Sequence, residues 1–124
     1  MEATRSPSPP GWRTVTPRIA VENPRGLVRF LAYVLGAAGD YELSRPTVLT
    51  LGDSQIMVGD SEARGTQLAF LYVYLNDPDA VYGRAMERNA ISIEQPRDTP
   101  YGDRRCTFKD PWGNTWQIAA PKES

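Results

Sequence analysis

The stretch LAFLYVYLNDP, residues 68–78, indicates a strand that passes directly into a helix. Its first eight residues are all apolar or aromatic, which is typical of a strand with a buried face. Asp77 can cap a helix with its carboxylate, and Pro78 suits the first helical position because its missing N–H is not needed there. The predicted helix continues with an apolar stripe of Val81, Tyr82, Ala85 and Met86.

The same order of elements occurs earlier in the chain. Residues 14–22 alternate as a strand does, Asn23 and Pro24 repeat the helix start, and Gly36 suits a left-handed C-terminal cap. Short strands are predicted after each helix, at residues 41–43, 47–51 and 55–58 and at residues 91–94, 104–109 and 114–120. We therefore predict two βαβββ units, residues 14–60 and 68–120, joined by a linker at 61–67. The alternative is two unrelated strand–helix pairs in one mixed domain.

The predicted fold class is α+β, with two curved mixed sheets around a cavity and the helices outside. Because 124 residues are the size of one domain, a single domain is expected at residues 14–120. Residues 1–13 are rich in proline and serine and are predicted to form a flexible tail. Residues 121–124 are predicted to form a short C-terminal tail.

The composition excludes several classes of function. With no histidine in the chain, Ser-His and Cys-His catalytic pairs and histidine-ligated metal sites are impossible. A net charge of −1 argues against a nucleic-acid partner. No apolar run is long enough to span a membrane, no signal peptide is indicated, and the single cysteine, Cys106, suits a reducing compartment. We expect a cytoplasmic protein without a membrane or nucleic-acid partner.

Side-chain alternation divides residues 68–75 into two faces. Leu71, Val73 and Leu75 suit packing against a helix, and three aromatic residues occupy the opposite, inner face. The candidate ligand-binding residues are Thr16, Arg18, Phe70, Tyr72, Tyr74 and Gln117 on the predicted inner face, together with Tyr101, Asp103 and Trp112. An aromatic and polar wall of this kind suits a planar or amphipathic small molecule. The alternative is that the three rings fill a core or a subunit interface.

Three motifs stand out: Asn23-Pro24 with the helix up to Gly36, the tetrapeptide at residues 101–104, and DPWGNTWQI at residues 110–118. Together they resemble the vicinal oxygen chelate superfamily, the group of glyoxalases, bleomycin-resistance proteins and extradiol dioxygenases. The resemblance covers residues 14–120. The last of the three motifs is similar to the glyoxalase/bleomycin-resistance branch of the superfamily. The resemblance implies the doubled fold above. It also implies a homodimer, because such relatives often bind ligands in grooves that two chains share.

The resemblance further implies a divalent metal held by inward positions of both units. The matching positions fall on or next to Thr16, on Phe70 and on Gln117. Phenylalanine has no donor atom and one neutral amide is not a metal site, so we expect no metal and no cofactor. What carries over is the cavity and not the metal chemistry.

Three hypotheses of function follow. The leading one is a non-catalytic protein that binds or sequesters a small aromatic or natural-product ligand, with Trp112 added to the aromatic wall. The second is a metal-independent enzyme of the same fold, for example a lyase or isomerase. Its available acids, bases and hydrogen-bond donors are Glu22, Asp60, Tyr101 and Asp103. The third is a dimeric interaction or regulatory module that offers Arg104, Arg105 and Lys109 to an acidic partner.

Overall fold

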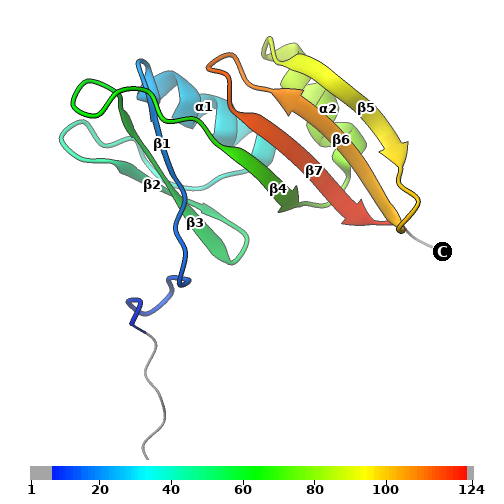
Figure 1. Cartoon of the computed structure of the whole chain (residues 1–124), viewed down its shortest axis with the longest axis horizontal. Coiled ribbons are helices and arrows are strands. Elements are labelled where there is room, and N and C mark those ends of the chain that lie inside the picture. Colours follow the sequence, from blue (N-terminus) through cyan, green and yellow to red (C-terminus); the bar gives the residue numbers. More distant parts are fainter. Residues whose placement is uncertain (1–6, 123–124) are drawn as a thin grey trace, which may run out of the picture.

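A computed structural model describes residues 7–122, which form two helices and seven strands in two sheets. Both sheets lie side by side in front of the two helices (Figure 1). The elements in chain order are β1 Arg18–Val21, α1 Pro24–Leu35, β2 Thr47–Leu51, β3 Ser54–Asp60, β4 Phe70–Tyr74, α2 Pro78–Glu87, β5 Ile91–Asp98, β6 Asp103–Lys109 and β7 Thr115–Pro121. The predicted α+β class is confirmed.

The strand order shows that each sheet comes from one half of the chain. The first sheet has the order β1-β3-β2, and the second has the order β4-β7-β6-β5. In both, the strand before the helix pairs in parallel with the last strand of the same half, so the helix makes the crossover between them. One hydrophobic core lies between the sheets and the two helices. The opposite side of both sheets, which we call the open face, carries no helix (Figure 1).

The helix ends follow the capping residues in the sequence. The Asn23 side chain accepts a hydrogen bond from the Gly26 N–H at 3.1 Å, and the Asp77 carboxylate accepts one from the Ala80 N–H at 3.2 Å. A proline opens each helix, and Gly36 ends α1 with a φ of 73°. The predicted starts of both helices are confirmed.

The first unit differs from the predicted βαβββ order, because the segment at residues 41–43 is not a strand. Ala38 exchanges two backbone hydrogen bonds with Thr50, at 2.8 and 2.9 Å, and forms an isolated bridge. Gly39 then takes a φ of 146° and the chain leaves the sheet. The N–H of Glu42 is bonded to the Thr47 side chain rather than to a strand. The fourth strand of this unit is thus reduced to one residue pair.

The motif at residues 110–118 is structural. One Asp110 oxygen accepts the backbone N–H groups of Trp112 and Asn114, at 2.9 and 3.0 Å. The other accepts the Asn114 side-chain amide and the Trp116 indole N–H, both at 2.9 Å. Asn114 in turn accepts the N–H of Ala69 at 2.8 Å, just before β4. The buried pair of Asp110 and Asn114 therefore fixes the turn between β6 and β7 to the start of β4.

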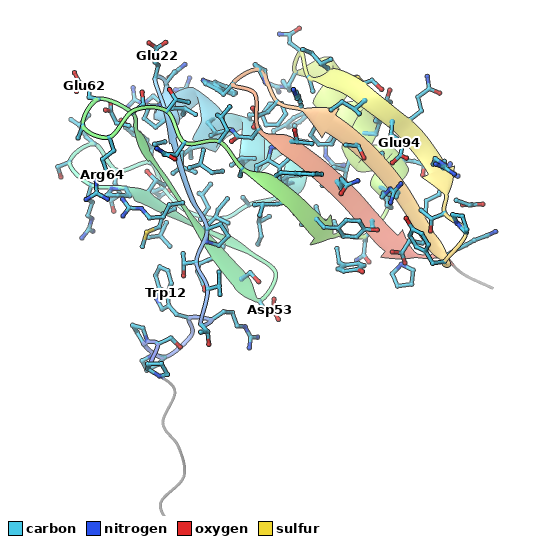
Figure 2. All side chains as sticks on the ribbon, in the orientation of Figure 1. Trp12, Glu22, Asp53, Glu62, Arg64 and Glu94 are labelled. Carbon is cyan, nitrogen blue, oxygen red and sulfur yellow. The ribbon has the colours of Figure 1, made fainter. Side chains whose placement is uncertain are left out.

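Both predicted tails have contacts where the structure describes them, and residues 1–6 and 123–124 lie outside the described residues. Arg13 donates to Asp53 in the β2–β3 turn at 2.9 Å. Figure 2 shows Trp12 and Asp53 at the same end of the molecule. At the other terminus, Pro121 still belongs to β7, and the Lys122 N–H donates to Gly102 at 2.7 Å. Within residues 7–122, neither helix is long and apolar enough to cross a membrane.

Candidate functional site

Strand β4 places its three aromatic residues on the open face, as the alternation predicts. Phe70 is 70% exposed, Tyr74 is 65% exposed and Tyr72 is 39% exposed. The intervening Leu71 and Val73 pack against the core on the helix side. The Tyr72 and Tyr74 rings are 5.4 Å apart between centroids, with planes tilted by 60°. The rings are not packed against a helix, and the single chain leaves them accessible.

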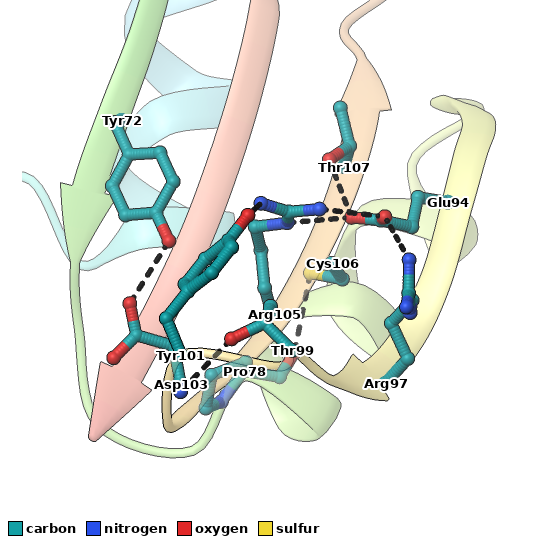
Figure 3. Close-up of polar contacts among 10 residues, drawn as sticks. All are labelled: Tyr72, Pro78, Glu94, Arg97, Thr99, Tyr101, Asp103, Arg105, Cys106 and Thr107. Carbon is teal, nitrogen blue, oxygen red and sulfur yellow. Dashed lines mark hydrogen bonds and ion pairs between the residues drawn. The ribbon is translucent and has the colours of Figure 1, made fainter. Parts of the chain in front are cut away.

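The neighbouring strands add a polar network beside these rings (Figure 3). Arg105 on β6 donates two parallel hydrogen bonds to Glu94 on β5, from Nε to Oε1 at 2.8 Å and from Nη2 to Oε2 at 2.9 Å. Thr107 donates to Glu94 Oε1 at 3.0 Å, and Arg97 reaches Oε2 at 3.4 Å. The hydrogen bonds from Arg105 hold the pKa of Glu94 at about 2, below its ordinary value of 4.5. Glu94 is therefore a fixed anion and a weak base at neutral pH.

A second contact reaches from β4 over β7 to β6. The Tyr72 hydroxyl donates to Asp103 Oδ2 at 3.0 Å, although β7 lies between the two strands. The side chains meet because Ala119, the β7 residue on this part of the open face, is small and has no exposed surface. Burial raises the pKa of Tyr72, and the hydrogen bond to the Asp103 carboxylate raises it further. Tyr72 therefore stays protonated and presents a fixed hydroxyl.

Other predicted residues join the same surface. Tyr101, in the β5–β6 turn, accepts a hydrogen bond from Arg105 Nη1 at 3.0 Å. Gln117 pairs with Tyr72 in the register of β4 and β7 and lies on the open face beside it. We call this surface of the second sheet the aromatic face. It consists of Phe70, Tyr72, Tyr74, Glu94, Tyr101, Asp103, Arg105, Thr107 and Gln117.

Three predicted residues, Trp112, Thr16 and Arg18, lie elsewhere. Trp112 stands on the helix side of the second sheet, edge-on to Phe30 with ring centroids 6.2 Å apart. It belongs to the packing of α1 and not to the aromatic wall, because the turn that contains it is drawn toward the core by Asp110. Thr16 precedes β1 and lies near Trp12 and Pro7. The structure therefore does not bring Thr16 or Trp112 to the aromatic face.

Arg18 lies on the open face of the first sheet, where it borders a separate hollow. This hollow has a volume of about 810 Å³ and is bounded by β1, the end of β3, the loop at residues 41–46 and the linker at 62–67. Its bottom is formed where Ala20 pairs with Gly59, two residues with little or no side chain. Asp60, a candidate base from the sequence, accepts the N–H of Glu62 at 2.7 Å and so shapes the linker.

Sequence reasoning did not single out Glu94 or Thr107. Their meeting depends on the pairing of β5 with β6, which contains two register shifts between Ser92 and Arg97. Counting alternate residues along β5 therefore assigns side chains to the wrong face of the sheet beyond the first register shift. A glutamate directly after Ile93, at the end of a predicted strand, is the one signal the sequence offers.

A divalent metal does not fit the residues of the aromatic face. Phe70 has no donor atom, and Gln117 offers a neutral amide. Both Glu94 oxygens accept hydrogen bonds from Arg105, and Asp103 accepts one from Tyr72. Across residues 7–122, no three His, Cys, Asp or Glu side chains gather as a ligand set. The face can stack on flat rings and hydrogen-bond to polar groups, and it has no oxygen set free to hold a cation.

Cys106 and Arg104, two further candidates from the sequence, are held in structural positions. Cys106 is buried on β6, and burial raises the pKa of its thiol to about 12, so it is not a nucleophile at neutral pH. Arg104 points to the helix side, where it donates to Asp79 at 2.8 and 2.9 Å and to Asp98 at 3.2 Å. These pairs tie β6 to α2 and β5. They leave no free basic cluster at Arg104 and Arg105.

Comparison with known proteins places this geometry among relatives. The sequence profile of the Glyoxalase/Bleomycin resistance protein/Dioxygenase superfamily matches residues 4–118. A search of curated proteins finds no significant match. Among solved structures, TioX from Micromonospora sp. ML1 is similar at 21% identity and a TM-score of 0.73, covering 86% of this chain and 97% of its own.

Two further solved structures differ in what their descriptions say. TnmS3, an antibiotic binding protein from Streptomyces sp. CB03234, has 22% identity and a TM-score of 0.68, covering 85% of this chain and 92% of its own. A glyoxalase/bleomycin resistance protein/dioxygenase family enzyme from Burkholderia phytofirmans PsJN has 18% identity and a TM-score of 0.71, covering 84% and 94%. At these identities the likeness concerns the fold, which serves binding and catalysis alike.

Proposed function

The chain belongs to the glyoxalase/bleomycin resistance protein/dioxygenase superfamily, and from this premise we propose that it binds or sequesters a small, flat aromatic molecule without metal catalysis. The observation that carries the proposal is the stripe of Phe70, Tyr72 and Tyr74, which no helix covers. Exposed aromatic side chains that lie in a row on a rigid strand are suited to stacking, which adds about 0.5–1.5 kcal/mol per ring pair. The antibiotic-binding relative TnmS3 has the same fold and supports this reading.

The polar network indicates which hydrogen-bonding groups the ligand should carry at its edge. Arg105 directs three N–H groups to Glu94 and Tyr101 and also interacts with the Tyr72 side chain, so these residues form a continuous polar row beside the aromatic stripe. Gln117 adds an amide with a donor and an acceptor. A flat ring system with carbonyl or hydroxyl groups on one edge would stack on the aromatic stripe and hydrogen-bond to this row. Because Glu94 is a weak base, the network favours recognition over proton abstraction.

We propose further that a second copy of the chain completes the site. An open sheet face covers one side of a flat molecule, whereas small-molecule sites bury about 70–90% of their ligand. Phe70, Tyr74 and the exposed Ile91 on β5 give this side of the molecule an apolar character that a homodimer would cover. Sedimentation equilibrium tests this point. A dimer that the ligand tightens is expected, and a monomer at all concentrations with and without ligand would contradict it.

The binding proposal is tested by calorimetric titration with fused-ring compounds that carry carbonyl or hydroxyl groups, such as an anthraquinone, a phenazine and a naphthol. We expect saturable binding of at least one compound. Phe70→Ala and Tyr74→Ala should each weaken it about tenfold, since each removes one stacking partner. Tyr33→Ala is the matched control, because Tyr33 is 40% exposed on α1, on the opposite side of the chain. No binding by any compound, or equal losses in the control, would contradict the proposal.

A further inference from the structure

The hollow over the first sheet has a different character from the aromatic face. It carries three arginines, Arg18 on β1, Arg45 in the loop after α1 and Arg64 in the linker before β4. Three segments that are distant in sequence therefore bring positive charge to one cavity. A volume of about 810 Å³ falls within the range of small-molecule sites, which is about 300–1,000 Å³.

The acidic residues around the hollow do not neutralise all of these arginines. Glu42 pairs with Arg45 at 3.2 Å, three residues along the same loop. Asp60 accepts the backbone N–H of Glu62, which fixes the linker. Glu62, labelled in Figure 2, belongs to the same linker and also lines the hollow. Within residues 7–122, none of the three carboxylates forms an ion pair with Arg18 or Arg64.

Arg18 and Arg64 differ from Arg45 in that neither guanidinium is held by a carboxylate of the described residues. Arg18 and Ala20 lie on the same face of β1, two residues apart, and Arg64 borders the hollow from the linker before β4. Two guanidinium groups at the rim of a cavity with a flat, backbone-lined bottom match a ligand that has an acidic group and a compact body.

We propose that this hollow is a second binding site, specific for a small organic anion that carries a carboxylate or a phosphate. Arg18 and Arg64 bind the acidic group, and the body of the ligand rests on Ala20 and Gly59. Tyr41 forms a side wall, and its position is held by Arg25, whose guanidinium stands 5.0 Å from its ring centre. The inference goes beyond the proposed function, because it concerns the other sheet and requires a negative charge on the ligand.

The test uses three ring compounds of nearly the same shape: benzoate, phenyl phosphate and the uncharged benzamide. Binding is followed by nuclear magnetic resonance of the arginine Nε–Hε groups in the whole chain. We expect benzoate or phenyl phosphate to shift the Arg18 and Arg64 signals in a saturable way, and benzamide to leave them unchanged. A response to only one of the two anions supports the site and identifies the acidic group that it prefers.

Matched variants distinguish specific binding by Arg18 and Arg64 from general attraction between the anion and a positively charged surface. Arg18→Gln and Arg64→Gln should each weaken anion binding about tenfold, because each removes a charged hydrogen-bond donor. Arg29→Gln removes the same charge from the exposed side of α1 and should have no effect. Equal binding of benzamide, equal losses in Arg29→Gln, or no saturable shift with either anion would overturn the inference. Phe70→Ala and Tyr74→Ala should leave anion binding unchanged, so failure here is distinguishable from failure of the aromatic face.

Discussion

Arg105 and Glu94 form the tightest ion pair on the open face, with two hydrogen bonds of 2.8 and 2.9 Å and side chains that are 14% and 20% exposed. The pair joins β6 to β5 at the point where the register of the two strands shifts. The pair therefore has two roles. It holds β5 and β6 together where their backbone pairing is irregular, and it fixes two charged side chains beside the aromatic stripe. This coupling of sheet stability to site geometry can be measured.

Glu94→Gln should destabilise the protein in a pH-dependent way. The pKa of Glu94 is lowered from 4.5 to about 2 in the folded chain. Its charge therefore contributes stability that is fully present above about pH 4.5 and is lost as the pH falls toward 2. We expect the variant to lose about 1–2 kcal/mol at pH 7, and the difference from the natural chain to shrink below pH 4.5. Urea unfolding at pH 7, 4 and 3 measures this, and a difference that does not change with pH would contradict it.

Two helical glycines should respond in opposite directions to the same substitution. A Cβ on Gly26 would lie 2.5 Å from Asn23 Nδ2 and 2.7 Å from Trp112 Cζ2, whereas a Cβ on Gly83 meets nothing within 4 Å. Gly26→Ala should therefore destabilise the chain by about 1–3 kcal/mol, because it disturbs both the cap and the indole packing. Gly83→Ala should stabilise it by about 0.5–1 kcal/mol. Thermal unfolding measures both, and the same sign for the two variants would refute this account of α1 and α2.

Asp110→Asn should be strongly destabilising although it changes the shape of the side chain very little. The carboxylate accepts hydrogen bonds from four donors, two on each oxygen. An amide offers one acceptor oxygen, so in either orientation two buried donors lose their partner. We expect a loss of about 2–4 kcal/mol in the free energy of unfolding and a shifted Trp116 indole signal. The exposed Asp40→Asn is the control and should change stability by less than about 0.5 kcal/mol.

Local signals in the sequence predicted those parts of the fold that local chemistry determines. Asn23 and Asp77 cap their helices, and the alternation in β4 puts Phe70, Tyr72 and Tyr74 opposite the core. These features depend on residues within a few positions of one another. The strand predicted at residues 41–43 does not form, because the Glu42 N–H donates to the Thr47 side chain and the pairing of this segment with β2 is limited to Ala38 and Thr50.

The rest depends on contacts between distant segments. The aromatic character of Trp112 predicts a place in the ligand wall, but Asp110 turns its segment toward the core. The hollow requires Ala20 and Gly59 to be paired, which only the register of β1 and β3 reveals. The alternation of residues along β4 likewise does not show that the aromatic stripe is left uncovered in the single chain. Such features follow from how the sheets are assembled, and a single sequence does not record that assembly.

The most direct test of the central claim is to locate the bound ligand by nuclear magnetic resonance. The chain is saturated with whichever fused-ring compound binds in the calorimetric titration, and contacts are read between the protons of the compound and assigned side-chain protons. Our account predicts contacts with the rings of Phe70, Tyr72 and Tyr74. Contacts confined to α1, α2 or the Trp112 ring, with the β4 rings unaffected, would contradict it.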